Sequence, residues 1–216
     1  MPLLMLDLDN TLVDRDVAFR DAAAVFLAEH ALPESDIEWL MSTDASGYTP
    51  RQAVATAAVD RYGASLPETA IRIFLDRGAT DRVVLAEATR DALSKATTHG
   101  WSCTIVTNGR TVQQEANIRN TGLDRLVHGW AISEEVGHQK PEPEIFKAAA
   151  TAVGASLHEA WVIGDSPQAD IAGANGLGVP SVWVSGGRPW TEAAYRPTHV
   201  TDDVASAIHY VIGIQR

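Results

Sequence analysis

The 216-residue chain contains one cysteine and three lysines, and both shortages restrict what it can be. Cys103 has no second cysteine to pair with, so a disulfide framework is excluded and a reducing compartment is favoured. No apolar run reaches the roughly 18 residues of a membrane-spanning helix, and the first residues lack the basic start of a signal peptide. We therefore expect a cytoplasmic protein with no membrane partner.

Nucleotide-binding and zinc-binding motifs are also missing. The sequence has no G-x-x-x-x-G-K-[ST] phosphate loop, and its seven histidines occur without H-E-x-x-H or C-x-x-C spacing. A formal net charge of −11 makes nucleic acid a poor partner. The hydrophobic content of 45% suits one packed domain with a small insertion, and the oligomeric state, monomer or homodimer, stays open.

Short apolar runs alternate with helical patterns through most of the chain. The predicted strands are residues 3–6, 101–107, 127–132, 160–164, 180–184 and 198–200, with helices predicted at 83–99, 112–120, 143–153, 167–175 and 203–212. Parallel strands need crossover helices, and strands buried on both faces appear as continuous apolar runs. The pattern therefore predicts an α/β fold with a doubly wound parallel sheet.

One interval is too long for this pattern. Thr11 and Thr107 are 96 positions apart, whereas one strand-helix-strand unit takes about 30 residues. The surplus has helical periodicity, and glycine and proline breaks divide it into four short helices. We predict a core domain of residues 1–13 and 85–216 and an inserted helical cap domain of residues 14–84.

The segment Asp7-Leu8-Asp9-Asn10-Thr11 places two carboxylates at the end of the first predicted strand. Side chains two positions apart on a strand point the same way, so both carboxylates are expected to face one crevice. Two ionised carboxylates at so short a distance repel each other unless a cation or a shared proton reduces the repulsion. The alternative is a solvated strand end with turn-forming aspartate and asparagine.

Two further segments offer groups that suit phosphate oxygens. Thr107-Asn108-Gly109 follows the second strand and supplies a hydroxyl, an amide and a glycine turn with backbone N–H donors. Lys140, followed by Pro141, opens a predicted helix and can neutralise an anion. Taken alone, Asn-Gly is a common turn and Lys140 an ordinary loop lysine.

The fourth segment follows the predicted strand at 160–164. Asp165 lies at the strand end, and Asp170 lies in the first turn of the next helix. In a purely structural interpretation, Asp165 caps that helix and Asp170 interacts with its dipole. Open parallel sheets bind ligands beyond the carboxyl ends of their strands, so all four segments are expected to converge on one crevice.

In order and spacing, the four segments resemble the motifs of haloacid dehalogenase-like (HAD) hydrolases. The matching residues are Asp7-Leu8-Asp9-Asn10-Thr11, Thr107-Asn108-Gly109, Lys140-Pro141, and Gly164-Asp165-Ser166 with Asp170. The long insert after the first motif, and the segments 133–137 and 170–178, are similar to the capped phosphatase branch of the superfamily. The resemblance implies a Rossmann-like HAD core with a helical cap inserted after the first motif.

The resemblance also implies a Mg²⁺-dependent phosphatase that hydrolyses small-molecule phosphate monoesters through an aspartyl-phosphate. Asp7 would be the nucleophile, and Asp9 would protonate the leaving oxygen and then deprotonate the attacking water. Magnesium would be bound by the carboxylates of Asp7 and Asp165 and by the backbone carbonyl of Asp9. The groups implied to hold or orient the transferred phosphoryl are Thr107, Asn108, Gly109 and Lys140, with Asp170 orienting Lys140 or a metal-bound water.

Two alternatives stay open. A phosphosugar mutase or other phosphotransferase would use the same Asp7 intermediate, and a non-catalytic phosphate-sensing module would be built on the same core. Dehalogenation is not expected, because the family's dehalogenases lack the second aspartate that this chain has as Asp9. Phosphonate cleavage is not expected either, because it needs a cap lysine and no lysine precedes Lys95. Candidate substrate-reading arginines, each ordinarily solvated, are Arg15, Arg20, Arg51 and Arg110.

Overall fold

A computed structural model of the chain describes residues 1–63 and 66–214. The chain divides into two compact units, one made of Met1–Val13 with Leu85–Arg216 and the other of Asp14–Val84. The same two ranges are predicted from the sequence to be a core domain and an inserted cap domain. We name them the core unit and the cap unit; the capping role itself remains a prediction.

The core unit is built on one six-stranded sheet in which the paired strands are parallel. The strands are β1 (Leu3–Leu6), β2 (Ser102–Thr107), β3 (Gly129–Ile132), β4 (Ala160–Gly164), β5 (Ser181–Val184) and β6 (His199–Thr201). Their order in the sheet is β3-β2-β1-β4-β5-β6, so the chain proceeds outward from β1 in both directions. This arrangement confirms the predicted α/β fold with a doubly wound parallel sheet.

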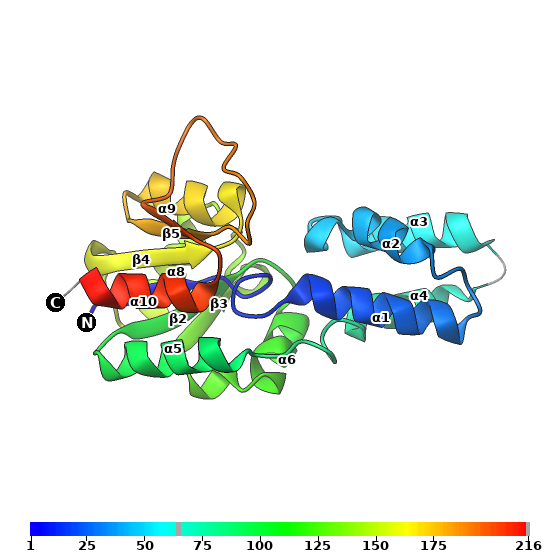
Figure 1. Cartoon of the computed structure of the whole chain (residues 1–216), viewed down its shortest axis with the longest axis horizontal. Coiled ribbons are helices and arrows are strands. Elements are labelled where there is room, and N and C mark those ends of the chain that lie inside the picture. The colour runs from blue at the N-terminus through cyan, green and yellow to red at the C-terminus, as the bar shows by residue number, and fades with distance from the viewer. Residues whose placement is uncertain (64–65, 215–216) are drawn as a thin grey trace. The chain divides into compact units, whose positions relative to one another are not determined.

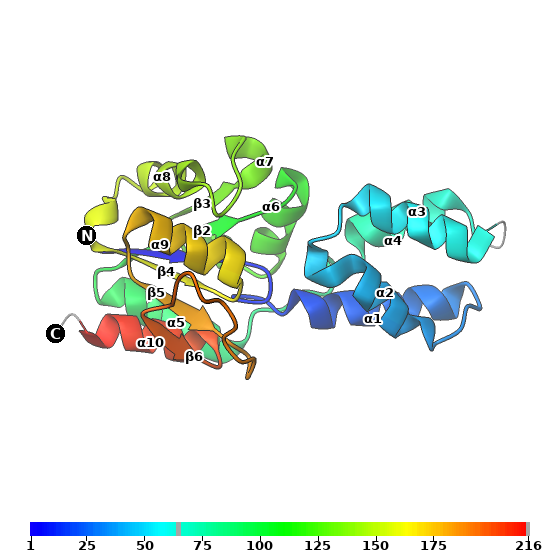
Figure 2. The ribbon, with the colours of Figure 1, turned by 90° about the horizontal axis from the view of Figure 1, so that it is seen from above.

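Helices cover both faces of this sheet (Figure 1, Figure 2). α5 (Glu87–Thr98) and α10 (Val204–Ile214) pack together on one face, and α8 (Pro143–Ala152) and α9 (Ala172–Leu177) lie on the other. α6 (Thr111–Asn120) and the short α7 (Ser133–Val136) begin where β2 and β3 end. Both faces are covered, as a purely parallel sheet requires.

The strands form because their apolar runs can be buried on both faces at once. All residues of β1, β2 and β5 are buried. Phe146 of α8 belongs to the same buried cluster as Leu3 and Met5 of β1, which joins that helix to the middle of the sheet. Cys103 in β2 has no exposed surface, and burial raises the pKa of its thiol to about 12, so the thiol stays protonated and unreactive.

Several element boundaries differ from the predicted ones, and three of the differences change how a segment begins. α5 begins at Glu87 rather than at residue 83, because residues 83–86 form an irregular connection. β3 begins at Gly129, since the chain just before it closes a short 3₁₀ turn. The predicted helix at 167–175 begins as a π-helical turn at Pro167–Ile171 before α9 follows. Within residues 1–63 and 66–214, no helix combines the length and the apolar character that crossing a membrane would need.

The described part of the cap unit is helical, with the four helices that the breaks predict. They are α1 (Arg15–Glu29), α2 (Asp36–Asp44), α3 (Arg51–Tyr62) and α4 (Glu68–Arg77). The ring of Phe74 stacks on Phe26 with centroids 4.4 Å apart and lies 5.3 Å from the ring of Phe19. Gly78 permits this close packing of α4 on α1, because a Cβ there would lie 3.0 Å from the Cβ of Ala22.

Two arginines that are candidate substrate readers form ion pairs inside the cap unit. The Arg15 guanidinium is buried and donates two hydrogen bonds to the Asp44 carboxylate, which also accepts the backbone N–H of Gly47 at 2.8 Å. Arg20 is partly exposed and pairs with Glu38. Arg15 is therefore not a solvated side chain; its charge holds α1 against α2.

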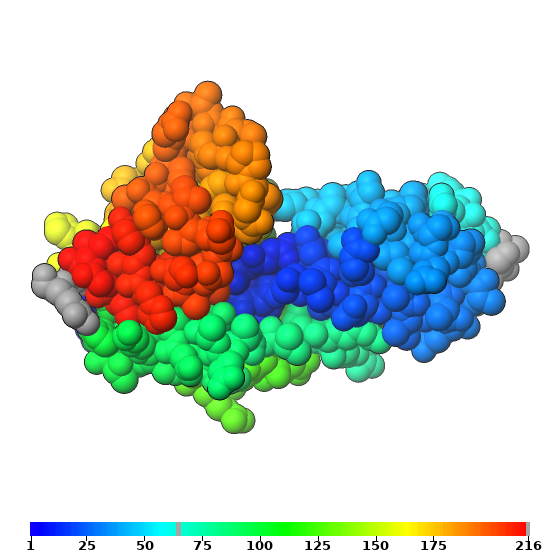
Figure 3. Space-filling model, viewed as in Figure 1, coloured from blue at the N-terminus to red at the C-terminus, as the bar shows by residue number. Residues whose placement is uncertain are grey.

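The segment between β5 and β6, residues 185–198, forms a ridge on the core unit, orange in Figure 3. Its aromatic side chains pack edge to face: the ring of Trp190 lies 5.0 Å from Trp183 of β5 and 5.9 Å from Tyr195. The guanidinium of Arg188 lies over the Trp183 ring at 5.6 Å. Packing on β5 therefore orders a segment that has no regular secondary structure.

We predict that Asp44→Ala destabilises the protein by about 3–5 kcal/mol, because it removes the buried carboxylate that accepts two hydrogen bonds from the Arg15 guanidinium. The matched control is Glu38→Ala, which removes the exposed partner of Arg20 and should leave the free energy of unfolding nearly unchanged. Urea unfolding followed by circular dichroism measures both. Equal effects in the two variants would contradict a structural role for the buried pair.

Candidate active site

The carboxyl edge of the sheet brings the predicted site residues together. β1 pairs with β2 on one side and β4 on the other, with Leu6 level with Ile105 and Ile163. The three strands end close to this level, so the residues after them leave the sheet at one edge. The chain order reverses between β1 and β4, which is where open α/β sheets place their ligand crevice.

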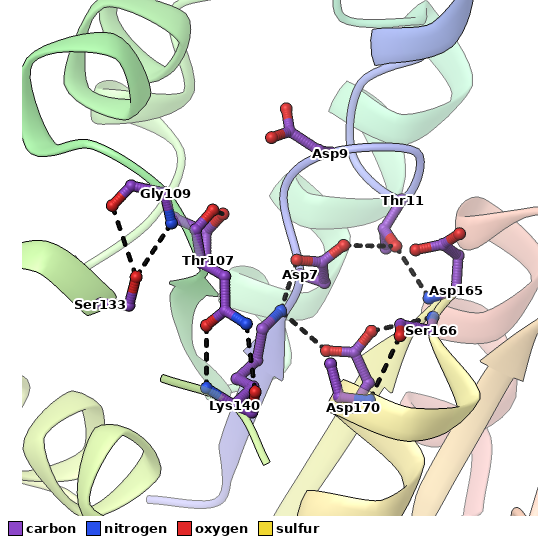
Figure 4. Close-up of polar contacts among 12 residues, drawn as sticks. Asp7, Asp9, Thr11, Thr107, Gly109, Ser133, Lys140, Asp165, Ser166 and Asp170 are labelled. Atoms are coloured by element: carbon purple, nitrogen blue, oxygen red, sulfur yellow. Dashed lines mark hydrogen bonds and ion pairs between the residues drawn. The ribbon is translucent and has the colours of Figure 1, made fainter. Parts of the chain in front are cut away.

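The turn after β1 separates the two carboxylates of the first motif. β1 ends at Leu6, and the backbone N–H groups of the three residues after Asn10 all donate to the carbonyl oxygen of Leu8. The side-chain alternation of a strand no longer applies in so tight a loop. The strand geometry behind the expectation that Asp7 and Asp9 point to one side therefore does not apply in this loop, and in the view of Figure 4 their carboxylates are directed apart.

Lys140 provides the buried positive charge of the site. Its ammonium donates to Oδ1 of Asp7 at 2.5 Å and to Oδ1 of Asp170 at 2.8 Å, and the residue is only 5% exposed. Burial acts to lower the pKa of Lys140, but the charges of Asp170 and Asp7 outweigh it and raise the pKa. The lysine of the third motif is thus a charged group that bridges two carboxylates (Figure 4).

Asp7 is held at both of its carboxylate oxygens. Oδ1 accepts from Lys140, and Oδ2 accepts from the Thr11 hydroxyl at 3.0 Å. The Thr11 oxygen in turn accepts the backbone N–H of Asp165 at 3.0 Å, which links the loops after β1 and β4. These contacts fix the orientation of a carboxylate that is only 7% exposed.

Asp165 is anchored from β5 and from the ridge. Its carbonyl oxygen accepts from the indole N–H of Trp183 at 2.8 Å and from Arg188 at 3.0 Å, and Arg188 reaches its carboxylate at 3.2 Å. Burial raises the pKa of Asp165, and the charges of Asp7 and Asp170 raise it further, against the opposing effect of the nearby cations. The site therefore concentrates negative charge.

The carboxylates of Asp7, Asp165 and Asp170 suit a divalent cation. Each offers an oxygen, and these atoms all lie within 4.8 Å of one another. Three carboxylates against the Lys140 ammonium and the Arg188 guanidinium leave a formal surplus of one negative charge. Mg²⁺ prefers oxygen ligands, so the residues present fit magnesium, with Asp7 and Asp165 as candidate ligands.

Gly164 and the π-helical turn set the position of Asp170. Asp170 is 1% exposed, and its Oδ2 accepts the backbone N–H of Ser166 at 3.0 Å. A Cβ on Gly164 would lie 2.2 Å from the carboxylate carbon of Asp170, so any larger residue there would displace it. Single π-turns occur frequently at functional sites. A carboxylate fixed in this way suits the predicted role of Asp170, which is to orient Lys140.

The second motif joins neighbouring loops. The Asn108 side chain exchanges two hydrogen bonds with the backbone of Lys140, donating at 3.1 Å and accepting at 2.8 Å. The backbone N–H of Gly109 donates to the Ser133 hydroxyl at 2.9 Å, and Thr107 is 1% exposed. The phosphate-binding role of Thr107, Asn108 and Gly109 stays a prediction; their contacts also fix the loop that presents Lys140.

Sequence reasoning gave no role to four residues that the structure brings to this edge: Thr11, Gln114, Ser133 and Arg188. Thr11 and Ser133 lie in segments that already match the HAD pattern, so their hydroxyls were available signals. Arg188 follows a Gly-Gly pair just beyond β5, a strand-end position like those of the four motifs. Gln114 lies on a helix, where nothing in the local pattern marks it.

Comparison with known proteins supports one family. Residues 4–184 match the family model described as haloacid dehalogenase-like hydrolase. The chain is 30% identical over 189 residues to a phosphoglycolate phosphatase of Caulobacter vibrioides, covering 85% of this chain and 79% of that protein. It is 38% identical over 95 residues to a phosphoserine phosphatase of Thermus thermophilus, covering 44% of this chain and 38% of that protein. For five of the curated relatives, among them this phosphoserine phosphatase, the matched part is less than half of their length.

The fold is also similar to that of a solved structure, the HAD-hydrolase YfnB of Bacillus subtilis. The two superimpose with a TM-score of 0.73 over 97% of this chain and 98% of that one. Their sequence identity is 24%, so the likeness establishes a shared fold and no more.

We predict that Thr11→Val lowers the free energy of unfolding by about 1–3 kcal/mol, because the buried N–H of Asp165 and Oδ2 of Asp7 lose their partner. Thr11→Ser is the matched control, since it keeps the hydroxyl and should retain most of the stability. Urea denaturation compares the two variants. A valine variant as stable as the serine variant would show that the hydroxyl does not link the two loops.

Proposed function

The chain belongs to the haloacid dehalogenase-like hydrolases, and on that basis we propose that it is a Mg²⁺-dependent phosphatase of small-molecule phosphate monoesters. The observation that carries the proposal is Asp7, a carboxylate held by Lys140 and Thr11 at the carboxyl edge of the sheet. Oxygens of Asp165 and Asp170 lie within 4.8 Å of it. The curated relatives that are named as phosphatases support the reaction class.

Asp7 is the proposed nucleophile. One of its oxygens attacks phosphorus, the bond from phosphorus to the leaving oxygen breaks, and an aspartyl-phosphate forms. Water then attacks phosphorus, which releases inorganic phosphate and regenerates the carboxylate. Lys140 would turn its charge toward the phosphoryl oxygens as Asp7 is consumed, while its contact with Asp170 at 2.8 Å keeps it in place.

Asp9 is the proposed general acid and base. It would give its proton to the leaving oxygen in the first step and take one from water in the second, so the protons balance over a cycle. In an in-line displacement, the leaving oxygen lies on the far side of phosphorus from the nucleophile. In the view of Figure 4, the Asp9 carboxylate is directed away from that of Asp7.

Magnesium is the proposed cofactor, held by the carboxylates of Asp7 and Asp165 and the backbone carbonyl of Asp9. When bound, it would shield Asp7 from the anionic substrate and neutralise charge that develops on the phosphoryl group. The proposed phosphoryl-binding groups are Thr107, Asn108, Gly109 and Lys140, with Asp170 orienting Lys140.

The substrate class and setting are part of the same proposal. Relatives named for phosphoglycolate and phosphoserine support a small phosphate ester rather than a macromolecule. The net charge of −11 argues against a nucleic-acid partner, and the single cysteine supports a cytoplasmic location. The cap unit would close over the site and exclude water from the phosphoryl group.

We predict that the protein with Mg²⁺ releases inorganic phosphate from small phosphate monoesters, and that EDTA stops the release until Mg²⁺ is restored. A panel of phosphoglycolate, phosphoserine, sugar phosphates and p-nitrophenyl phosphate tests this, with phosphate detection and chromatography of the products. A phosphorylated isomer formed without phosphate release would indicate a mutase. No turnover on the whole panel would favour a phosphate-sensing module.

We predict that Asp7→Asn abolishes turnover, because the amide is a poor nucleophile and has lost the charge that would bind Mg²⁺. Asp9→Asn should slow both steps by about 10² to 10⁴-fold while preserving Mg²⁺ binding. The turnover of Lys140→Ala should lie between the turnovers of these two variants, because the loss of the ammonium weakens transition-state stabilisation by about 2–4 kcal/mol. Steady-state kinetics at saturating Mg²⁺ measures all three. Wild-type turnover in Asp7→Asn would mean that another residue is the nucleophile.

A further inference from the structure

Gln114, in the first turn of α6, contacts two of the four motifs. It is 3% exposed, and its Nε2 lies 2.9 Å from Oδ2 of Asp9 and 2.7 Å from the hydroxyl oxygen of Thr107. The same nitrogen lies 3.2 Å from the carbonyl oxygen of Asn108. One buried amide therefore connects the proposed acid and base to the proposed phosphoryl-binding turn.

The other end of the amide defines its direction. Oε1 of Gln114 accepts from the side-chain nitrogen of Asn117 at 3.1 Å, and Asn117 is itself 2% exposed. With Oε1 facing a donor, the two hydrogens on Nε2 face Asp9 and Thr107. The opposite orientation would place the amide oxygen against the Asp9 carboxylate and lose these bonds.

Gly109 leaves the space that Gln114 occupies. The backbone of Gly109 has φ +145°, and a Cβ there would lie 3.1 Å from both Cγ and Cδ of Gln114. Any larger residue at 109 would press on the glutamine and move its amide. The position of the amide therefore depends on two residues, Gln114 in α6 and Gly109 in the loop before it.

We propose that Gln114 is a positioning residue for proton transfer: its amide orients the Asp9 carboxylate relative to the phosphoryl-binding turn at Thr107. The inference rests on the proposed function, since it takes Asp9 as the general acid and base. Gln114 acts through Asp9 and has no part in nucleophilic attack by Asp7. Removing the Gln114 amide should therefore slow only those steps in which Asp9 transfers a proton.

Substrates with different leaving groups distinguish proton transfer by Asp9 from nucleophilic attack by Asp7. An alkoxide has to be protonated as it departs, whereas p-nitrophenolate is stable enough to leave as the anion. The ratio kcat/KM reports the steps up to departure of the leaving group, so it isolates the acid role of Asp9 from its later role as base. A damaged fold or a misplaced Thr107 would slow both substrates alike.

The test compares Gln114→Met with wild type on an alkyl phosphate and on p-nitrophenyl phosphate, at saturating Mg²⁺. Methionine keeps the unbranched shape and removes the donor, so kcat/KM should fall roughly tenfold on the alkyl phosphate and change little on the aryl phosphate. Gln113→Met is the matched control on the neighbouring residue of α6 and should leave both substrates unaffected.

A double-mutant cycle makes the test specific. In the Asp9→Asn background, Gln114→Met should cause no further loss on the alkyl phosphate, because the group it positions is already inactive. Equal losses on both substrates, or a further loss in the Asp9→Asn background, would overturn the proposal.

A crystal structure of Gln114→Met gives a readout that does not depend on activity. The proposal expects the Asp9 carboxylate to leave the position it has beside Gln114, and an unchanged Asp9 would contradict it. If the wild type hydrolysed neither substrate, the proposed function would fail, while this structure would still decide whether Gln114 positions Asp9.

Discussion

The arrangement of the core unit depends on one buried charge, the ammonium of Lys140 between the carboxylates of Asp7 and Asp170. An isolated ammonium or carboxylate in a protein interior costs several kcal/mol, so each of these groups is tolerable only because the others are there. The loops after β1, before α8 and after β4 therefore have to assemble as a set. Completion of the sheet and assembly of the site are for this reason one process, because a displaced loop would leave an unpaired charge inside the protein.

Glycines, which have no side chain, determine the packing at this edge as much as the charges do. Gly164 makes room for the carboxylate of Asp170, and Gly109 makes room for Gln114. Behind them, a Cβ on Gly173 would lie 2.6 Å from the ring of Phe146, so α9 can pack directly on α8 only with glycine at this position. Protein interiors are close-packed, and the carboxyl edge of this sheet is packed in the same way.

The sequence predicts features that follow from one physical rule along a whole helix or strand. It does not predict contacts that form beyond the end of that element. Continuous apolar runs predicted the parallel strands, and the strand ends predicted that Lys140 would approach Asp7, 133 residues away. Strand alternation did not extend to Asp9, because β1 ends at Leu6. The partner of Arg15 lies 29 residues away in the cap unit, and Arg188 meets Asp165 only through the packing of the ridge. Such meetings follow from tertiary packing, which no local pattern records.

The central place of β1 has a consequence for synthesis on the ribosome. Leu3 pairs with Ser102 on one side and with Ala160 on the other, so the strand made first gains its second neighbour more than 150 residues later. At typical translation rates this interval is on the order of 10 s. During that time one edge of an entirely apolar strand has no partner within its own chain. The unpaired edge therefore makes the nascent chain prone to aggregation until β4 emerges.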